Sequence, residues 1–451
     1  MIYQTTRNIN EAKTFEEIVL SSNAQCGGLY LPKTFPQLNR EDFIGLSYIQ
    51  IAQKIMGIFT SIPENEIAEI CGKSLLNFEN VEPVLTKKLE ENLTVAELFH
   101  GPTLSFKDYP MQFLGNITEH ILKQKKQNLN IITATSGDTG SAAIHAFAGK
   151  KNIKIAVLHP HGCVTEFQRK QMTTRHEKNV LNIAAGGTFD DCQKMVKTIT
   201  NASNAKESKI STVNSINWGR IMMQIVYYIW LSCRNNNANF FVPTGNFGNI
   251  FACYFLKKCG FEGIGKLFIS NNSNDILANA YKTGILKNQK TLHTLSPAVD
   301  ISKPSNFERM AFIESGFNAE YTREIFIKLQ NEDVQINQDL LANFHKNFGV
   351  ASISDDETLA QIKEVHEKYG YIICPHTALA FAHHKKENNT QNSVIIATAH
   401  PCKFEDAVQK AIGIKAEIPK NNQGILKKEE KFEILEINEI QKKVLTWFNE
   451  E

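Results

Sequence analysis

From about residue 130 onward, short apolar segments alternate with helices, and polar glycine-containing loops join several of them. Residues 130–134 are expected to form a buried strand, followed by a polar loop and a helix of small residues that ends at Gly149. The same order is expected over 240–258 and 371–384, with further strands over 153–160, 180–185, 265–272 and 393–397. This alternation predicts parallel sheets covered on both faces. Such sheets bind ligands at the carboxyl ends of their strands, where these loops lie.

The first 95 residues differ from the rest of the chain. They contain helical patterns over 14–20 and 42–56 and one turn-rich segment over 26–32, but no clear alternation of strands and helices. We therefore predict a mainly helical N-terminal extension that packs on an α/β catalytic body. Further helices are expected from Asp190 and over 217–233.

The charge balance gives no reason to expect a polyanionic partner. Lys and Arg number 49, Asp and Glu number 47, and the formal net charge is +2. Neither nucleic acid nor an anionic membrane is therefore an expected partner. The longest apolar run, 221–233, is too short to span a bilayer, and residues 1–17 lack the apolar stretch of a signal peptide. We expect a cytoplasmic enzyme.

The potential metal-ligating residues are scattered. Nine cysteines occur without any CxxC pair, and thirteen histidines show no spacing typical of metal ligands. We expect no metal, and we interpret the cysteines as free thiols in a reducing compartment.

One lysine, Lys107, follows a Gly-Pro turn and is preceded by Phe106. A lysine held in an apolar pocket has a lowered pKa, because burial disfavours its charged form. The neutral amine is a nucleophile that can form a Schiff base with an aldehyde. On its own, however, a lysine beside a phenylalanine is more often a surface residue with a buried stem.

Three other polar segments follow predicted strands. The loop at 135–140 (TSGDTG) precedes a helix, so its amides and hydroxyls could hold a carboxylate, although simple helix capping is the alternative. The loop at 243–249 (PTGNFGN) suits a phosphate or is a plain turn, and its spacing does not match a dinucleotide fingerprint. Thr398 could bond to a ring nitrogen or to its own backbone.

Together these segments resemble the motifs of the threonine synthases, a family of fold-type II (tryptophan-synthase-like) enzymes that use pyridoxal 5′-phosphate (PLP). The resemblance rests on residues 98–110, 133–143, 243–249 and 397–404, which occur in the family's order. It continues through 26–32, 213–228 and 295–309, and so covers nearly the whole chain. The extension and the loop with Asp138 are similar to those of the longer members of the family.

The resemblance implies two parallel-sheet α/β domains of the fold-type II architecture behind the extension. Residues 1–95 would be the extension. Residues 96–238 would form a smaller domain with the PLP lysine and the substrate-carboxylate loop. Residues 239–451 would form a larger domain with the phosphate loop and the C-terminal motif.

The resemblance also implies the roles of individual residues. Lys107 would carry PLP as a Schiff base, and Thr398 would face its pyridine nitrogen. The phosphate of PLP would be cradled by Gly245, Asn246, Phe247, Gly248 and Asn249. The substrate carboxylate would lie near Thr135, Ser136, Gly137, Asp138 and Thr139. Shorter members and related dehydratases have Asn where Asp138 stands, which leaves open whether Asp138 contacts the 3′-oxygen of PLP.

The implied reaction converts O-phospho-L-homoserine and water into L-threonine and phosphate, the last step of threonine biosynthesis. Once the substrate amine displaces Lys107, this lysine is the natural base for the α-proton. The departing phosphate needs cations and donors, and the candidates are Asn214, Ser215, Asn217 and Arg220. Arg220 is the first choice because it would lie one turn into an otherwise apolar helix. Lys170 and Arg169 are further candidates, and Arg309 is a weaker one.

Three alternatives stay open at this point. The chain could be another fold-type II lyase, such as a threonine or serine dehydratase, a non-catalytic relative, or a nucleotide-binding regulator that uses the glycine loops. His100, before the Gly-Pro turn, could shuttle protons or could order the turn by hydrogen bonding. No sequence feature indicates the oligomeric state.

Overall fold

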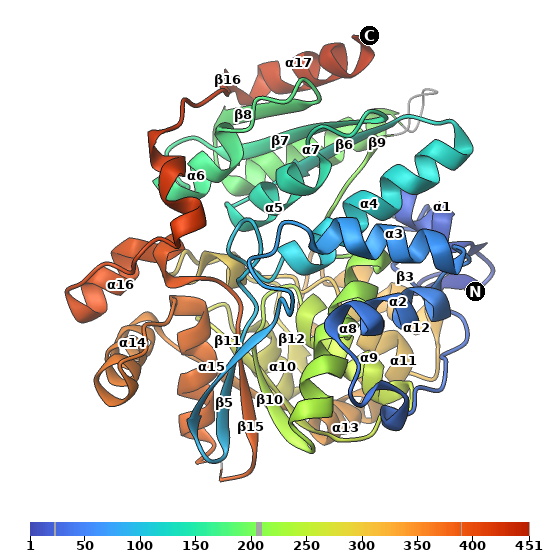
Figure 1. The fold of residues 1–451 in the computed structure, drawn as a ribbon. Helices are drawn as coiled ribbons and strands as arrows, with labels where there is room; N and C mark the ends of the chain where they lie inside the picture. Colours follow the sequence, from blue (N-terminus) through green and yellow to red (C-terminus); the bar gives the residue numbers. More distant parts are fainter. Residues whose placement is uncertain (22–23, 204–209, 389, 451) are drawn as a thin grey trace.

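Two large sheets, each covered by helices, organise the molecule (Figure 1). The computed structural model describes residues 1–21, 24–203, 210–388 and 390–450. In Figure 1 the five-stranded sheet lies in the upper part of the molecule and the six-stranded sheet below it. The expectation of an α/β fold with two parallel-rich sheets is therefore confirmed.

The six-stranded sheet has the order β14-β11-β10-β15-β5-β4. All its pairs are parallel except β4 with β5, which form an antiparallel pair at one edge. Its central strands β10 and β15 are buried at every position, as expected for strands covered on both faces. The strands are β4 Leu85–Glu90, β5 Leu93–Glu97, β10 Ala238–Pro243, β11 Ile264–Asn271, β14 Phe348–Ser352 and β15 Ser393–Ala397.

The five-stranded sheet has the order β16-β8-β7-β6-β9, and every pair is parallel. Its strands are β6 Leu129–Ala134, β7 Ile153–Pro160, β8 Val180–Gly186, β9 Ile210–Ser211 and β16 Glu433–Glu436. Helix α17 (Ile437–Asn449) follows β16 and packs on α7 (Phe189–Ser203) and β8. The C-terminal end of the chain therefore returns to this sheet, as the red helix at the top of Figure 1 shows.

The long helix α8 (Trp218–Arg234) forms the centre of the core. It is buried from Trp218 to Ser232 and contacts α2, α4 and α9. Asn217 caps its first turn, because its side-chain oxygen accepts a hydrogen bond from the amide of Gly219. The helix α4 (Asp108–Lys125), which begins beside Lys107, contacts α8 on one side and α5 on the other.

The remaining helices cover the two sheets and the extension. They are α1 Phe15–Ser21, α2 Tyr48–Phe59, α3 Glu64–Leu75, α5 Asp138–Phe147, α6 Glu166–Thr173, α9 Gly248–Lys258, α10 Ile276–Thr283, α11 Phe307–Glu314, α12 Ala319–Lys328, α13 Gln338–Asn347, α14 Asp355–Tyr369, α15 Pro375–Lys386 and α16 Glu405–Ile412. Short 3-10 helices are η1 Arg40–Phe43, η2 Pro297–Val299, η3 Pro401–Phe404 and η4 Lys420–Lys427, and β12 Ile285–Leu286 pairs with β13 Val334–Gln335. Within the described residues, no helix has the length and apolarity needed to cross a membrane.

The N-terminal extension is not only helical. Strands β1 (Tyr3–Thr5), β2 (Ala12–Lys13) and β3 (Tyr30–Pro32) form a small antiparallel sheet. The alternation rule missed it because β1 and β3 are short and buried at every position. Arg7 and Glu308 form a salt bridge of 2.7 Å that ties this sheet to α11.

Two strands pair with a sheet outside the domain to which the predicted boundaries assign them. Strand β4 lies within the range 1–95 but pairs with β5 of the six-stranded sheet. Strand β16 lies within 239–451 but pairs with β8 of the other sheet. The boundaries at 95 and 238 otherwise stay a prediction.

The strand expected at the start of 371–384 is absent. Residues 371–374 link α14 to α15 without strand pairing. The apolar character of this link serves packing, because Ile373 lies in one buried cluster with Val95 and Ile362. Cys374 and Pro375 then begin the helix, with the Cys374 sulfur accepting a hydrogen bond from the amide of Thr377.

Candidate active site

The segment before Lys107 is hydrogen-bonded to the residues that follow the carboxyl end of β15. The amide of Phe106 donates to the carbonyl of Thr398 at 2.8 Å, and the amide of His400 donates to the carbonyl of Leu104 at 3.0 Å. Leu104 has φ of 59°, a left-handed conformation that is uncommon for a residue with a branched side chain. These contacts bring Lys107 and Thr398, which are far apart in sequence, into neighbouring positions.

Lys107 stands at the start of α4 and is 9% exposed. Its Nζ lies 3.3 Å from Asp138 Oδ2 and 5.0 Å from the centre of the Phe106 ring. Burial lowers the pKa of Lys107, and the positive charges of Arg220 and Lys403 lower it further, against the opposing effect of Asp138. The lowered pKa makes it easier for Lys107 to lose its proton and react as a neutral amine.

Asp138, the first residue of α5, connects Lys107 to a second buried lysine. Its Oδ1 lies 3.1 Å from Lys403 Nζ and accepts a hydrogen bond of 2.8 Å from Gln168 Nε2. Burial alone would raise the pKa of Asp138, but Lys403 and Lys107 outweigh it and hold that pKa well below its usual range. These two lysines therefore hold Asp138 in its charged carboxylate form.

The loop between β6 and α5 is held by Thr135. The Thr135 hydroxyl accepts hydrogen bonds from the amides of Gly137 and Gly140, each at 2.9 Å. Gly137 has φ of 134°, and a Cβ atom there would lie 2.6 Å from the side chain of Gln168. Ser136 and Thr139 remain partly exposed at the N-terminus of α5, where free amides favour an anion.

The loop between β10 and α9 combines tight backbone packing with a free donor. A Cβ atom on Gly245 would lie 2.9 Å from the carbonyl oxygen of Ala298, so only glycine fits without movement. Phe247 has φ of 63°, and its buried ring packs on Phe307. Asn249 Nδ2 is buried and has no hydrogen-bond partner among the described residues.

Neighbouring residues fix the position of this loop. Asn306 donates from its amide at 3.1 Å and from its side chain at 3.0 Å to the carbonyl of Asn246. A Cβ atom on Gly248 would lie 3.2 Å from the same side chain. Asn306 therefore holds this loop through its backbone at Asn246 and leaves little space at Gly248.

Arg220 is the predicted phosphate-binding cation that the structure places near Lys107. It is 3% exposed, and Nη1 donates to the carbonyl of Val213 at 3.0 Å. Its Nε is buried without a partner in the described part of the chain. Burial lowers the pKa of Arg220 to about 10. A buried cation with an unused donor is suited to an incoming anion.

The residues next to Arg220 have different environments. Asn214 and Ser215 are partly exposed in the loop before α8. Both side-chain groups of Asn217 already have protein partners, because its oxygen accepts from Gly219 and its nitrogen donates to the carbonyl of Val19 at 3.2 Å. A substrate contact of Asn217 stays a prediction.

The other cations considered have partners within the protein. Arg169 donates to Glu430, and Lys170 donates to the carbonyl oxygens of Leu426 and Lys428. Arg309 is fully buried and donates to the backbone carbonyls of Tyr30 and Ile216.

His100 lies between two carboxylates. Its Nδ1 is 3.2 Å from Glu79 and its Nε2 is 2.8 Å from Glu97. Burial alone would lower the pKa of His100, but the two glutamates outweigh it and raise that pKa. This arrangement favours ordering of the turn before Lys107.

Sequence reasoning missed four residues of this site. Gln168 and Lys403 contact Asp138, Gln171 contacts Lys403, and His376 lies close enough to act on the charge of Asp138. Lys403 lies in the C-terminal motif, residues 397–404, but no property of this motif indicated that its lysine is fully buried. The helix of Gln168 and Gln171, α6, carried no signal beyond ordinary amphipathic spacing.

These features fit PLP. A buried lysine of lowered pKa can hold the aldehyde carbon, and the tight Gly245 turn with the free Asn249 donor at the start of α9 can hold a phosphate. Groups of His, Cys, Asp or Glu that could hold a metal do not occur among the described residues.

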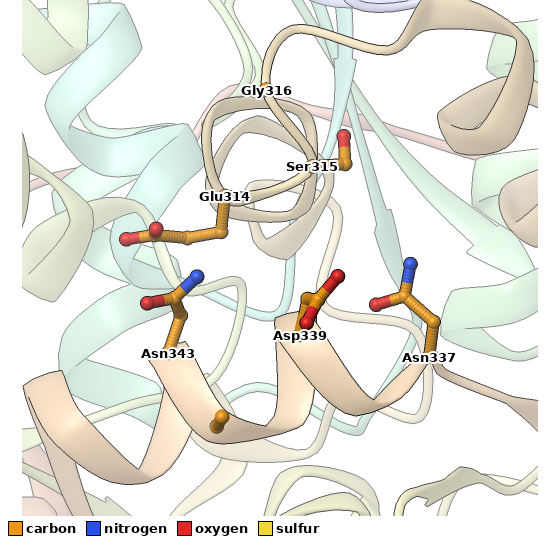
Figure 2. Close-up of a pocket in the computed structure, with 7 residues that line it drawn as sticks. Glu314, Ser315, Gly316, Asn337, Asp339 and Asn343 are labelled. Atoms are coloured by element: carbon orange, nitrogen blue, oxygen red, sulfur yellow. The ribbon is translucent and has the colours of Figure 1, made fainter.

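A surface pocket elsewhere does not belong to this site. It is lined by residues from the end of α11, from α13 and from its N-cap, including Glu314, Asn337, Asp339 and Asn343 (Figure 2). Glu314 forms a salt bridge of 2.8 Å with Lys258. None of the predicted site residues lines this pocket.

Comparison with known proteins agrees with this site. Residues 82–323 match the family model described as pyridoxal-phosphate dependent enzyme. Residues 2–75 match the model of the threonine synthase N terminus, and residues 376–444 match that of the threonine synthase C-terminal region.

Full-length relatives give the same result. The threonine synthase of Methylobacillus glycogenes is 38% identical over 97% of each chain, and that of Pseudomonas aeruginosa is 37% identical over 96% of each chain. The crystal structure of PLP-bound threonine synthase from Brucella melitensis superposes with a TM-score of 0.94 at 35% identity and covers 100% of both chains.

The fold, the buried lysine and the first family model define the class: this is a PLP-dependent enzyme. Within that class, the chain belongs to the threonine synthase family and acts in threonine biosynthesis. The full-length matches set aside the non-catalytic and dehydratase alternatives.

Proposed function

We propose that this chain converts O-phospho-L-homoserine and water into L-threonine and phosphate at the site around Lys107. The observation that carries the proposal is the position of the Lys107 amine, buried beside Asp138 and next to the Thr398 end of β15. The loops at 135–139 and 243–249 follow strands β6 and β10, at the strand ends where ligands of such sheets bind.

The residues that would hold PLP are Lys107, Thr398 and the loop from Gly245 to Asn249. When bound, PLP withdraws electrons from the carbon atoms near the substrate amine, so that protons there become acidic. Asn249 would donate from Nδ2 to the phosphate, since its oxygen already accepts from Tyr227 and Tyr228. Thr398 would offer a hydroxyl to the ring nitrogen without adding charge.

Lys107 would move the proton at the substrate α-carbon. Burial lowers the pKa of its amine, which favours the uncharged form that can accept a proton once the substrate amine has replaced it. The amides of Ser136, Asp138 and Thr139, beside the Gly137 amide that already donates to Thr135, would bind the substrate carboxylate. Arg220 would face the departing phosphate, because it is a buried cation with an unused Nε donor.

The test uses purified protein supplied with PLP and O-phospho-L-homoserine. Phosphate and L-threonine should appear in equal amounts, and Lys107→Ala should abolish both. Lys257→Ala is the matched control, because that partly buried lysine donates to the backbone carbonyl of Gly265 and has no proposed role in the site. Formation of ammonia and a keto acid from L-threonine, without phosphate release from O-phospho-L-homoserine, would refute the proposal.

A further inference from the structure

Lys403 is a fully buried ammonium on η3, just beyond the carboxyl end of β15. Its Nζ donates to the carbonyl of Thr103 at 2.5 Å and to Gln171 Oε1 at 2.7 Å, and lies 3.1 Å from Asp138 Oδ1. A buried charge is costly unless it is paired and hydrogen-bonded, and Asp138 supplies the pairing.

The two oxygens of Asp138 have separate partners. Oδ1 is bound by Lys403 and Gln168, whereas Oδ2 lies 3.3 Å from Lys107. Two ammonium groups thus share one carboxylate. If Lys403 were removed, Asp138 would depend on Lys107 for its counter-ion and would hold the proton on that amine.

We propose that Lys403 is a positioning residue for Lys107: as the counter-ion of Asp138, it leaves the Lys107 amine free to lose its proton and to react. The inference rests on the proposed role of Lys107 in holding PLP. It adds a residue whose effect reaches the cofactor through Asp138.

The other groups around Lys107 support this assignment. Arg220 from α8 is a second cation that acts on Lys107, and it cannot serve as a proton acceptor. His376 from α15 is neutral, because burial lowers its pKa to about 3 and its Nε2 accepts a hydrogen bond of 3.0 Å from the Ala298 amide. Asp138 is the carboxylate that raises the pKa of Lys107. The extent to which other cations neutralise Asp138 therefore affects the pKa of the Lys107 amine.

The test measures how PLP attachment to Lys107 depends on pH in the full-length protein. PLP is removed, then added back between pH 6 and 10. The attachment rate is followed by visible absorbance, and attachment at Lys107 is confirmed by the mass of the Lys107 peptide after borohydride reduction.

Lys403→Met should move the pH midpoint of attachment upward by about one unit, which corresponds to a tenfold slower rate at neutral pH. Adding Asp138→Asn to Lys403→Met should return the midpoint to the original value or below.

This rescue separates the proposed role from a purely structural one. A fold weakened by loss of the Thr103 and Gln171 contacts would lower the amount of attached PLP at every pH, but it would not move the pH midpoint, so the midpoints are what is compared. Lys257→Met, which removes a partly buried lysine that donates to the carbonyl of Gly265, should leave the midpoint unchanged. If circular dichroism shows that Lys403→Met is unfolded, Lys403→Gln is measured in its place and the same order of midpoints is expected.

Two results would overturn the inference: an unchanged midpoint in the Lys403 variant, or a double variant no better than the single one. Failure of the unsubstituted protein to attach PLP at Lys107 would instead refute the proposed function. The two failures are therefore distinguishable.

Discussion

The hydroxyl of Tyr228 donates a hydrogen bond of 2.8 Å to Asn249 Oδ1, and Tyr227 donates one of 2.7 Å to the same oxygen. These two bonds fix the amide so that its nitrogen faces away from the tyrosines. That nitrogen is buried at the start of α9 without a partner among the described residues. A buried donor without an acceptor costs free energy, and a bound phosphate would remove that cost.

Replacing Asn249 by Leu should therefore weaken PLP binding. A hydrogen bond to a charged group contributes about 1.5–3 kcal/mol, so the dissociation constant for PLP should rise roughly 10- to 100-fold. Titration of the PLP-free protein measures it. Tyr228→Phe should have a smaller effect, because Tyr227 still holds the amide. Wild-type affinity in Asn249→Leu would remove this residue from the phosphate site.

Replacing Arg220 by Gln should impair substrate use more than PLP binding. Loss of charge-assisted hydrogen bonds to the substrate phosphate should lower kcat/KM roughly 10- to 100-fold. Steady-state phosphate release measures this, with PLP content checked by absorbance. Arg234→Gln, at the exposed end of the same helix, is the control. An unchanged kcat/KM in Arg220→Gln would mean that another group binds the phosphate.

Replacing Gly245 by Ala should destabilise the protein and weaken PLP binding. The new Cβ would lie 2.9 Å from a backbone carbonyl oxygen, and overpacking of this kind costs about 1–3 kcal/mol. The thermal midpoint should fall. Gly72→Ala in α3 is the matched control, because a Cβ there would contact nothing within 4 Å. Equal midpoints for both variants would show that the loop adjusts to the added methyl group.

The buried His376 predicts sensitivity to acid. Its pKa is about 3 in the folded protein and 6.5 ordinarily, so between these values the unfolded chain binds a proton that the folded chain does not. Stability should therefore fall as pH decreases from 6.5, by at most about 1.4 kcal/mol per pH unit for this group. In His376→Gln this contribution is absent, so the difference in thermal midpoint from the unsubstituted protein should shrink between pH 7 and pH 5. A constant difference would exclude His376 as a source of acid sensitivity.

Much of the fold could be predicted because buried parallel strands are short apolar runs bounded by polar loops. Residues 393–397 are strand β15 as predicted, and 130–134 fall within β6. The run at 371–374 has the same apolar character but links two helices. A sequence pattern records that a segment is buried, not which neighbour buries it.

The candidate site could be predicted only where its residues stand in recognisable loops. Lys107 follows Phe106, and Lys403 precedes Phe404, so neither lysine is distinguished by its neighbours. The difference lies in partners from other segments, because Thr103, Asp138 and Gln171 surround Lys403 only after both sheets have formed. Asn217 is predicted from the sequence to bind the substrate, but in the structure its side chain caps helix α8.

The pairing of β16 with β8 bears on how the molecule is made. Strands β6 to β8 leave the ribosome long before residues 433–436 are synthesised, and the outer edge of β8 has no strand beside it until then. An open parallel edge is a template for pairing with another chain. During synthesis, a nascent chain stalled before β16 would thus expose this edge to chaperones and to neighbouring nascent chains.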